Sequence, residues 1–290
     1  MTGVDAAKDR IMTTLFSSLA TMGGLGALFA TALAIADKKL RVQEDPRIGV
    51  VAEALPGANC GACGFAGCGA YADAVVTAGG PVNKCPVGGQ DTATRVGAIM
   101  GIDAGVMDKH VVRLMCRGTA ALAHAKAQYA GPTSCAVQDL VSGGGKACQW
   151  GCLGGGDCVA ACSFGALEMG PAGLPVVFDD LCTACAACVT ACPRHILELH
   201  PIDREFFVFC KSHDDPKLAK WACDAACLAC GICARKSDGA VVMVDNLPVI
   251  DYDKLDPSLI PLDKCKPGAI GWLQAENALQ PHSPAFGEEN

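Results

Sequence analysis

The run Cys182-Thr-Ala-Cys185-Ala-Ala-Cys188-Val-Thr-Ala-Cys192-Pro193 decides how the carboxyl-terminal half of this chain folds. In C-x2-C-x2-C-x3-C-P spacing, three thiolates surround one [4Fe–4S] cluster and the fourth reaches another. Structural zinc usually closes on two separated C-x2-C pairs, and a disulfide framework belongs to small secreted domains, so neither predicts this run. The run therefore predicts iron–sulfur clusters with the local chain wrapped around them.

A second cysteine pattern occurs twice, once before this run and once after it. C-x12-C-x3-C occurs from Cys135 to Cys152 and again from Cys210 to Cys227. Each copy continues with positions spaced like the cluster ligands of a two-cluster ferredoxin. In the first copy these positions are 155, 158, 162, 182, 185, 188 and 192. In the second copy they are 230, 233, 237, 255, 258, 261 and 265. We therefore expect two tandem ferredoxin-like modules of βαβ type with pseudo-twofold symmetry, over 135–203 and 204–274, with β-hairpins at 166–178 and 240–250.

The first module has one complete ligand set and one incomplete set. The complete set is Cys162, Cys182, Cys185 and Cys188. The incomplete set is Cys152, Cys158 and Cys192, with Gly155 where a thiolate belongs. Three readings are open: a three-iron cluster, a site that borrows Cys148, or a relic. Cys148 is favoured because it lies one short loop away and thiolate is the preferred iron–sulfur ligand.

The second module keeps only one of its two sets. The retained ligands are Cys227, Cys230, Cys233 and Cys265. The slots of the other set hold Ser237, Leu255, Ser258 and Pro261. Because none of these side chains is a thiolate, we expect one cluster here and the loss of its partner.

A separate signature precedes the repeats. In Asn59-Cys60-Gly-Ala-Cys63-Gly-Phe-Ala-Gly-Cys68 three cysteines cluster, and Cys85-Pro86 follows at a distance. Three close cysteines and one remote cysteine predict a self-contained [4Fe–4S] site in a small helical domain over 41–96. With the sets above, the expected content is four [4Fe–4S] clusters, or about sixteen irons per chain.

The remaining cysteines are harder to interpret. Cys135, Cys148, Cys210 and Cys223 recur at matching gaps, which indicates a used geometry, although free cysteine also packs as a small buried hydrophobe. Cys116 stands alone in residues 97–134, an alanine-rich stretch that reads as a helical connector, and is interpreted as structural.

The amino-terminal region predicts a membrane anchor over residues 1–40. Residues 11–36 carry no charged side chain, a length that exceeds the hydrocarbon core of a bilayer. Lys38, Lys39 and Arg41 follow, so the basic-residue rule places everything after the anchor in the cytoplasm. A cleaved signal peptide is the alternative; it is disfavoured because export would carry twenty thiols into an oxidising compartment. Residues 275–290 form a polar tail.

Composition and missing motifs exclude several function classes. A net charge of −7 gives no basic surface for nucleic acid. Gly143-Gly144-Gly145-Lys146 lacks the upstream glycine and the following Ser or Thr of a phosphate-binding loop. The six histidines are scattered, whereas a self-sufficient redox enzyme needs a site with grouped titratable side chains. An electron-relay protein is therefore favoured over such an enzyme.

The chain resembles the B subunit of the Rnf complex, the bacterial membrane-bound ferredoxin:NAD oxidoreductase that translocates Na+ or H+. The resemblance runs from the anchor through residues 55–68 and Cys85-Pro-Val-Gly-Gly89 to the repeats, with departures at Gly155, at the lost second-module slots and at Lys266. It implies a single-pass subunit of the bacterial cytoplasmic membrane without a complete activity of its own. The expected partners are soluble ferredoxin, other membrane subunits and the lipid bilayer. The expected fold class is α+β.

Overall fold

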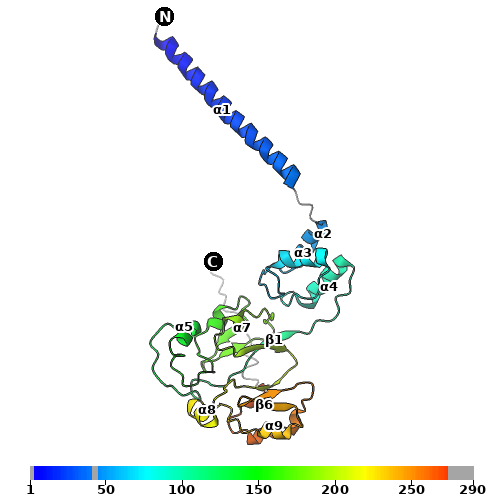
Figure 1. Cartoon of the computed structure of the whole chain (residues 1–290), viewed down its shortest axis with the longest axis vertical. Helices are drawn as coiled ribbons and strands as arrows, with labels where there is room; N and C mark the ends of the chain where they lie inside the picture. Colours follow the sequence, from blue (N-terminus) through cyan, green and yellow to red (C-terminus); the bar gives the residue numbers. More distant parts are fainter. Residues whose placement is uncertain (1–2, 41–44, 274–290) are drawn as a thin grey trace, which may run out of the picture. The chain divides into compact units, whose positions relative to one another are not determined.

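The computed structural model describes residues 3–40 and 45–273. It divides the chain into two compact units, Met1–Pro46 and Arg47–Asn290. The first unit contains one long helix, α1 (Gly3–Leu40), which includes the predicted apolar run (Figure 1). Met12–Lys39 has 28 residues and a mean hydropathy of 1.8, so it has the length and composition to cross a membrane. Arg41 and the predicted tail at 275–290 lie outside the described residues.

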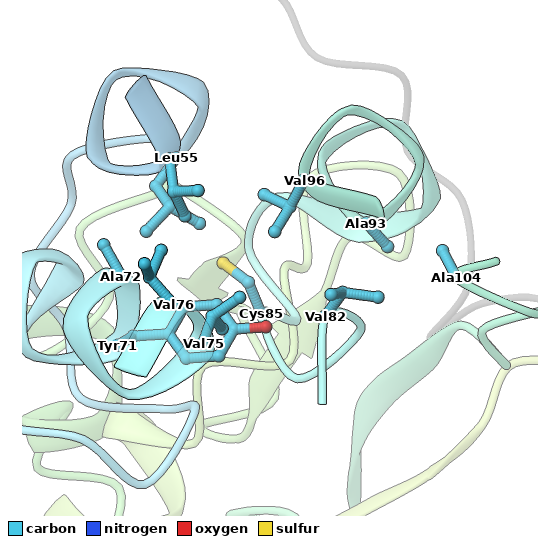
Figure 2. Packing of buried hydrophobic residues seen from close by; sticks show 11 residues of the cluster. Leu55, Tyr71, Ala72, Val75, Val76, Val82, Cys85, Ala93, Val96 and Ala104 are labelled. Atoms are coloured by element: carbon cyan, nitrogen blue, oxygen red, sulfur yellow. The ribbon is translucent and has the colours of Figure 1, made fainter. Parts of the chain in front are cut away.

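Three short helices follow, namely α2 (Pro46–Ala54), α3 (Cys68–Ala78) and α4 (Gly89–Met100). Their apolar faces enclose a core in which Tyr71, Val75 and Val96 are almost fully buried and to which Cys85 also contributes (Figure 2). The Tyr71 hydroxyl donates to the backbone oxygen of Pro81 over 2.8 Å. These helices share one apolar core, which continues past residue 96 as far as Ala104.

The region of the first predicted module, together with β1 from the preceding stretch, contains two pairs of antiparallel strands and three short helices. Its elements are β1 (His110–Leu114), α5 (Cys135–Leu140), α6 (Asp157–Ala160), β2 (Leu167–Met169), β3 (Pro175–Val177), α7 (Ala187–Ala191) and β4 (Leu197–Pro201). Strand β1 pairs with β4, and β2 pairs with β3 in the hairpin that the sequence predicts. Buried Val112 and Leu167 pack beside Cys158 and Cys188, so thiols and hydrocarbon share one core.

The prediction that 97–134 is a helical connector is wrong. Helix α4 ends at Met100, and β1 lies in the middle of this stretch. Further along, Ala123 forms an isolated β-bridge with Cys223, and Ala125 forms one with Lys146. Backbone groups of the connector form hydrogen bonds with distant segments rather than within a helix. The alanine content of the sequence does not reveal this pairing.

The second module repeats the arrangement. Its elements are β5 (Phe206–Val208), α8 (Pro216–Ala222), α9 (Ile232–Lys236), β6 (Val241–Val244), β7 (Leu247–Ile250), the 3-10 turns η1 (Pro257–Leu259) and η2 (Leu262–Lys264), and β8 (Ile270–Trp272). Strand β6 pairs with β7 in the predicted hairpin, and β5 pairs with the distant β8. Asp215 caps α8 by accepting hydrogen bonds from the backbone amides of Lys217 and Leu218.

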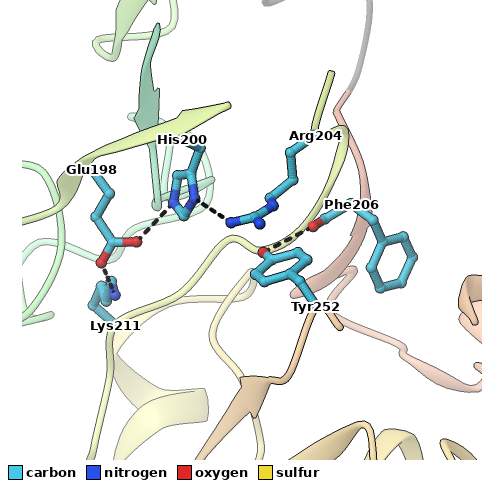
Figure 3. A network of polar contacts seen from close by, with 6 residues as sticks. All are labelled: Glu198, His200, Arg204, Phe206, Lys211 and Tyr252. Atoms are coloured by element: carbon cyan, nitrogen blue, oxygen red, sulfur yellow. Dashed lines mark hydrogen bonds and ion pairs between the residues drawn. The ribbon is translucent and has the colours of Figure 1, made fainter. Parts of the chain in front are cut away.

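Polar contacts hold the two modules against each other (Figure 3). On β4, the Glu198 carboxylate accepts a hydrogen bond from Lys211 of the second module and lies 3.1 Å from His200 Nε2. Arg204 of the second module lies with its Nη1 atom 3.3 Å from His200 Nδ1 of the first module, and its guanidinium also sits over the Tyr252 ring of its own module. These contacts place residues near the first thiol of the second module beside the last strand of the first.

Candidate metal centres

The first group of thiols lies in the amino-terminal helical domain. Cys63 and Cys68 pack against the core that includes Cys85, and Cys60 lies in the same loop with its side chain exposed. The Asn59 side-chain oxygen accepts a hydrogen bond of 2.9 Å from the Cys68 amide and so folds the loop back on itself. Burial raises the pKa of Cys85, and the neighbouring Cys63 raises it further. This domain therefore groups Cys60, Cys63, Cys68 and Cys85 as expected.

The complete set of the first module also comes together. Cys162, Cys182, Cys185 and Cys188 line one hollow. Cys188 lies in the first turn of α7, and Ala184 and Ala186 have φ of 55° and 62°, which turns the loop between the thiols. The amide of Val112 on β1 lies 3.5 Å from Cys182 Sγ, and the amide of Ala166 lies 3.3 Å from Cys162 Sγ. Sheet and hairpin thus supply hydrogen bonds to the sulfurs, an arrangement that tunes iron–sulfur sites.

The structure places Cys135 beside the incomplete set of the first module. One hollow is lined by Cys135, Cys152, Cys158 and Cys192. A Cβ atom added to Gly155 would lie 2.9 Å from Cys135 Sγ, so the sulfur of Cys135 occupies the space that a cysteine at 155 would fill. The Asp157 carboxylate accepts hydrogen bonds of 2.9 Å from the amides of both Cys135 and Ala136, which ties α5 to the start of α6.

The expectation that Cys148 fills the slot of Gly155 is therefore wrong. Cys148 lines a different hollow, together with Cys116. The sequence offered only a partial signal, since Cys135 is the earlier member of the same C-x12-C pair; the hydrogen bond from its amide to Asp157 is seen only in the structure. Proximity in sequence favoured Cys148, whereas α5 brings Cys135 to the site from farther away.

The retained set of the second module surrounds a cavity of about 250 Å³, larger than the roughly 20 Å³ of the two hollows just described. Cys227, Cys230, Cys233 and Cys265 all line it. Cys230 is exposed, so this set reaches the molecular surface. Burial raises the pKa of Cys227 to about 11.

Apolar side chains and a serine hydroxyl occupy the positions of the lost set in the second module. Leu255 packs beside Ile260, Val241 and Phe206 in an apolar cluster. The buried hydroxyl of Ser237 donates to the backbone oxygen of Ala234 over 3.1 Å and accepts from the amide of Val241 over 2.9 Å. The structure places no thiol in this cluster except Cys233 and Cys265 of the retained set.

Four thiols remain, and all of them line one further hollow. They are Cys116, Cys148, Cys210 and Cys223. Cys116 follows β1, Cys210 follows β5 and Cys223 caps the carboxyl end of α8, so three distant segments converge here. Sequence reasoning left these thiols open, and it assigned Cys116 to packing. The recurring gaps were a valid signal for Cys148 and Cys223, which occupy equivalent positions in the two repeats.

The surroundings of the buried thiols disfavour free thiolates. Burial, together with neighbouring cysteines, raises the pKa of Cys152 and Cys188 to about 12 and that of Cys158 to about 11. Such groups are protonated at neutral pH, and they release protons when iron binds. Within residues 3–40 and 45–273, no three His, Cys, Asp or Glu side chains are placed to hold a single metal ion.

Comparisons with known proteins agree with this geometry. The FeS family, described by its Fe–S cluster, matches residues 55–87, and the Fer4 family, described as a 4Fe-4S binding domain, matches residues 175–198. These matches contain the amino-terminal signature and the run at Cys182 to Cys192.

Three relatives are similar over most of the chain, and each is the B subunit of its complex. That of the Na(+)-translocating ferredoxin:NAD(+) oxidoreductase complex of Acetobacterium woodii is 41% identical, covering 90% of this chain and 78% of the relative. The B subunit of the ion-translocating oxidoreductase complex of Methanosarcina acetivorans is 40% identical, and the alignment covers 83% of this chain and 92% of the relative. The B subunit of the proton-translocating ferredoxin:NAD(+) oxidoreductase complex of Clostridium ljungdahlii is 36% identical, and the alignment covers 94% of this chain and 97% of the relative. The chain therefore belongs to the family of B subunits of ion-translocating oxidoreductase (Rnf) complexes.

Proposed function

We propose that this chain is the iron–sulfur electron-relay subunit of a membrane-bound, redox-driven ion-translocating complex. It accepts electrons from reduced ferredoxin and passes them to membrane subunits toward NAD. The observation that carries the proposal is the convergence of thiols, four at a time, on separate hollows in a chain of this family. Four cysteines around one hollow are the donor set that holds a [4Fe–4S] cluster.

The geometry supports four ligand sets. They are Cys60, Cys63, Cys68 and Cys85; Cys135, Cys152, Cys158 and Cys192; Cys162, Cys182, Cys185 and Cys188; and Cys227, Cys230, Cys233 and Cys265. Bound clusters supply one-electron transfer. The chain's own residues hold the thiols, bury Cys85, Cys152, Cys158 and Cys188, and direct backbone amides at several of the sulfurs.

Exposure of the sets indicates where electrons enter and leave. Cys60 and Cys230 are exposed, whereas Cys152, Cys158 and Cys188 are buried. A donor protein must approach a site closely, so the exposed sets suit exchange with partners and the buried sets suit internal relay. One electron enters as ferredoxin is oxidised and one leaves to the next subunit, with no atom transferred.

The charges beside α1 support an orientation. Lys38 and Lys39 lie in its last turn, on the carboxyl side of the apolar stretch. Because cytoplasmic flanks carry the excess of basic residues, this supports a cluster-bearing unit in the cytoplasm of a bacterial cell and a helix in the inner membrane. Ferredoxin then meets the exposed sets without crossing the bilayer.

One experiment tests both donor and orientation. The full chain, loaded with iron and sulfide without oxygen, is placed in sealed inverted and right-side-out membrane vesicles and mixed with reduced ferredoxin outside. We expect bleaching of cluster absorbance in inverted vesicles alone, and no NAD reduction in either, because the sequence has no nucleotide-binding fingerprint. Bleaching only in right-side-out vesicles contradicts the orientation, and sustained NAD reduction contradicts the relay role.

A further inference from the structure

The ligand sets assigned above leave Cys116, Cys148, Cys210 and Cys223 without a function. Each of the four lines the same hollow, between the connector, the first module and the second. Neither family match reaches this hollow, since the matches cover 55–87 and 175–198. Buried thiols in a core are ordinary, but four of them facing one another from three segments call for a reason.

Two glycines show how closely the sulfurs approach a common centre. A Cβ atom at Gly118 would lie 3.3 Å from Cys223 Sγ and 3.5 Å from Cys116 Sγ. A Cβ atom at Gly151 would lie 3.3 Å from Cys148 Sγ and 3.7 Å from Cys116 Sγ. Both glycines leave open the space between pairs of sulfurs, which a side chain would fill.

All four sulfurs have the same local geometry. Each receives a hydrogen bond from the backbone amide two residues further along the chain. For Cys116 and Cys210 the donors are Gly118 and Ser212, each at 3.4 Å. For Cys148 and Cys223 the donors are the amides of Trp150 and Ala225. Amides aimed at sulfur stabilise metal-bound thiolate, and plain packing gives no reason for the same donor at four sites.

The charges around the hollow suit an anionic group. Arg117 and Lys146 both line it. Lys146 Nζ donates to the backbone oxygen of Gly118 over 3.3 Å, and Arg117 sits over the Phe209 ring at 3.8 Å. Four thiolates around a [4Fe–4S] core carry a net negative charge, which these two cations offset at short range.

Contacts outside the hollow fix the segments that carry the four thiols. The β-bridges from Ala123 and Ala125 reach Cys223 and Lys146, so one short connector segment fixes both sides of the hollow. The Trp150 ring nitrogen donates to Asp214 over 3.0 Å, which fastens the loop of Cys148 to the second module.

From these observations we infer that Cys116, Cys148, Cys210 and Cys223 bind a fifth [4Fe–4S] cluster, which joins the two ferredoxin-like modules. The inference rests on the relay function proposed above. Cys152 of a first-module set lines this hollow as well, and the amide of Cys227 of the second-module set donates to Cys210 Sγ over 3.3 Å. The site therefore lies between the two modules' clusters and passes one electron at a time from one to the other. With it, all twenty cysteines of the chain are ligands.

Iron counting and electron paramagnetic resonance of the full chain, loaded anaerobically, test this inference. We expect about twenty irons in the wild type and about sixteen in Cys116→Ser and in Cys223→Ser. The double variant Cys116→Ser/Cys223→Ser should lose no more than either single variant, because both residues serve one cluster. Cys116→Ser/Cys227→Ser should instead lose about eight irons, because two clusters are affected.

The remaining clusters report on folding in every variant, since their resonance signals persist only if the modules are intact. About sixteen irons in the wild type would overturn the fifth site and leave the relay function standing. Sixteen irons with one bound zinc would overturn it in favour of a structural zinc site with four thiolate ligands. A chain without cluster absorbance would overturn the relay function itself. The wild-type count alone decides the matter if a variant fails to fold.

Discussion

The two predicted ferredoxin-like modules differ in what occupies the sites of their missing cysteines. The first module lacks one thiol, at Gly155, and Cys135 from an earlier helix stands in its place. The second module lacks four thiols at once, and Leu255 and Ile260 fill the region with hydrocarbon. One missing ligand is compensated by another thiol, whereas four missing ligands turn a metal site into an apolar core.

The difference teaches what holds each half-module together. In the first module, Cys158 and Cys188 are part of the buried cluster that also contains Leu167. A core built partly of thiols depends on the bound group to organise it, since metal binding contributes to folding. In the second module, the rebuilt region relies on apolar burial, which needs no metal.

The largest effect is expected at the compensated site. Cys135→Ser should remove one cluster, about four irons, or leave a three-iron cluster, because it deletes the fourth thiol of Cys152, Cys158 and Cys192. Iron content and the oxidised resonance spectrum of the full chain measure this. An unchanged spectrum would return the fourth ligand to Cys148.

Restoring the ordinary slot should not rescue that variant. A Cβ atom at Gly155 would lie 2.0 Å from the backbone oxygen of Thr133, so Gly155→Cys must displace the chain that carries Cys135. We expect Cys135→Ser/Gly155→Cys to remain depleted in iron. Gly49→Ala is the matched control, because a Cβ atom there meets nothing within 4 Å.

A smaller effect is expected in the rebuilt region of the second module. Ile260 is 4% exposed, and Ile260→Ala should lower the free energy of unfolding by about 2–5 kcal/mol through lost burial and a cavity. Iron content should stay at the wild-type value. Leu259→Ala, at a neighbour that is 42% exposed, should change stability by less than about 0.5 kcal/mol. Loss of iron in Ile260→Ala would show that the apolar fill supports the retained cluster too.

The smallest effect concerns the contact between the modules. Hydrogen bonds from His200 and then Lys211 lower the pKa of Glu198 to about 2. The folded-state pKa is below the unfolded value of about 4.3, so the carboxylate stabilises the fold above that pH, and this is lost as pH falls toward 2. We expect Glu198→Gln to unfold faster than the wild type at pH 6, as measured by unfolding rates after pH jumps. The difference between the two unfolding rates should disappear between about pH 4.3 and 2.

Glu168→Gln removes the same charge from an exposed position on β2 and should not alter the pH dependence. A gap between Glu198→Gln and wild type that stays constant as the pH falls would show that Glu198 acts by shape rather than charge.

Sequence spacing predicted the parts of the molecule that local chain geometry determines. The run from Cys182 to Cys192, both hairpins and the amino-terminal signature follow from neighbouring residues, and all are found in the structure. The role of Cys135 could not be reached this way, because it depends on Asp157 fixing α5 beside α6. Strand β1 was missed for a similar reason: its partner β4 lies far along the chain, and pairing with it overrides the local preference of the connector.

Arg117 ties the order of synthesis to the order of assembly. Its guanidinium donates to the backbone oxygens of Gly268 and Trp272, each over 2.7 Å, across separations of 151 and 155 residues. At ribosomal rates, that length of chain takes on the order of ten seconds to emerge. Arg117 therefore makes its two backbone contacts only after nearly all of the chain has been synthesised, so the connector reaches its final hydrogen bonding late.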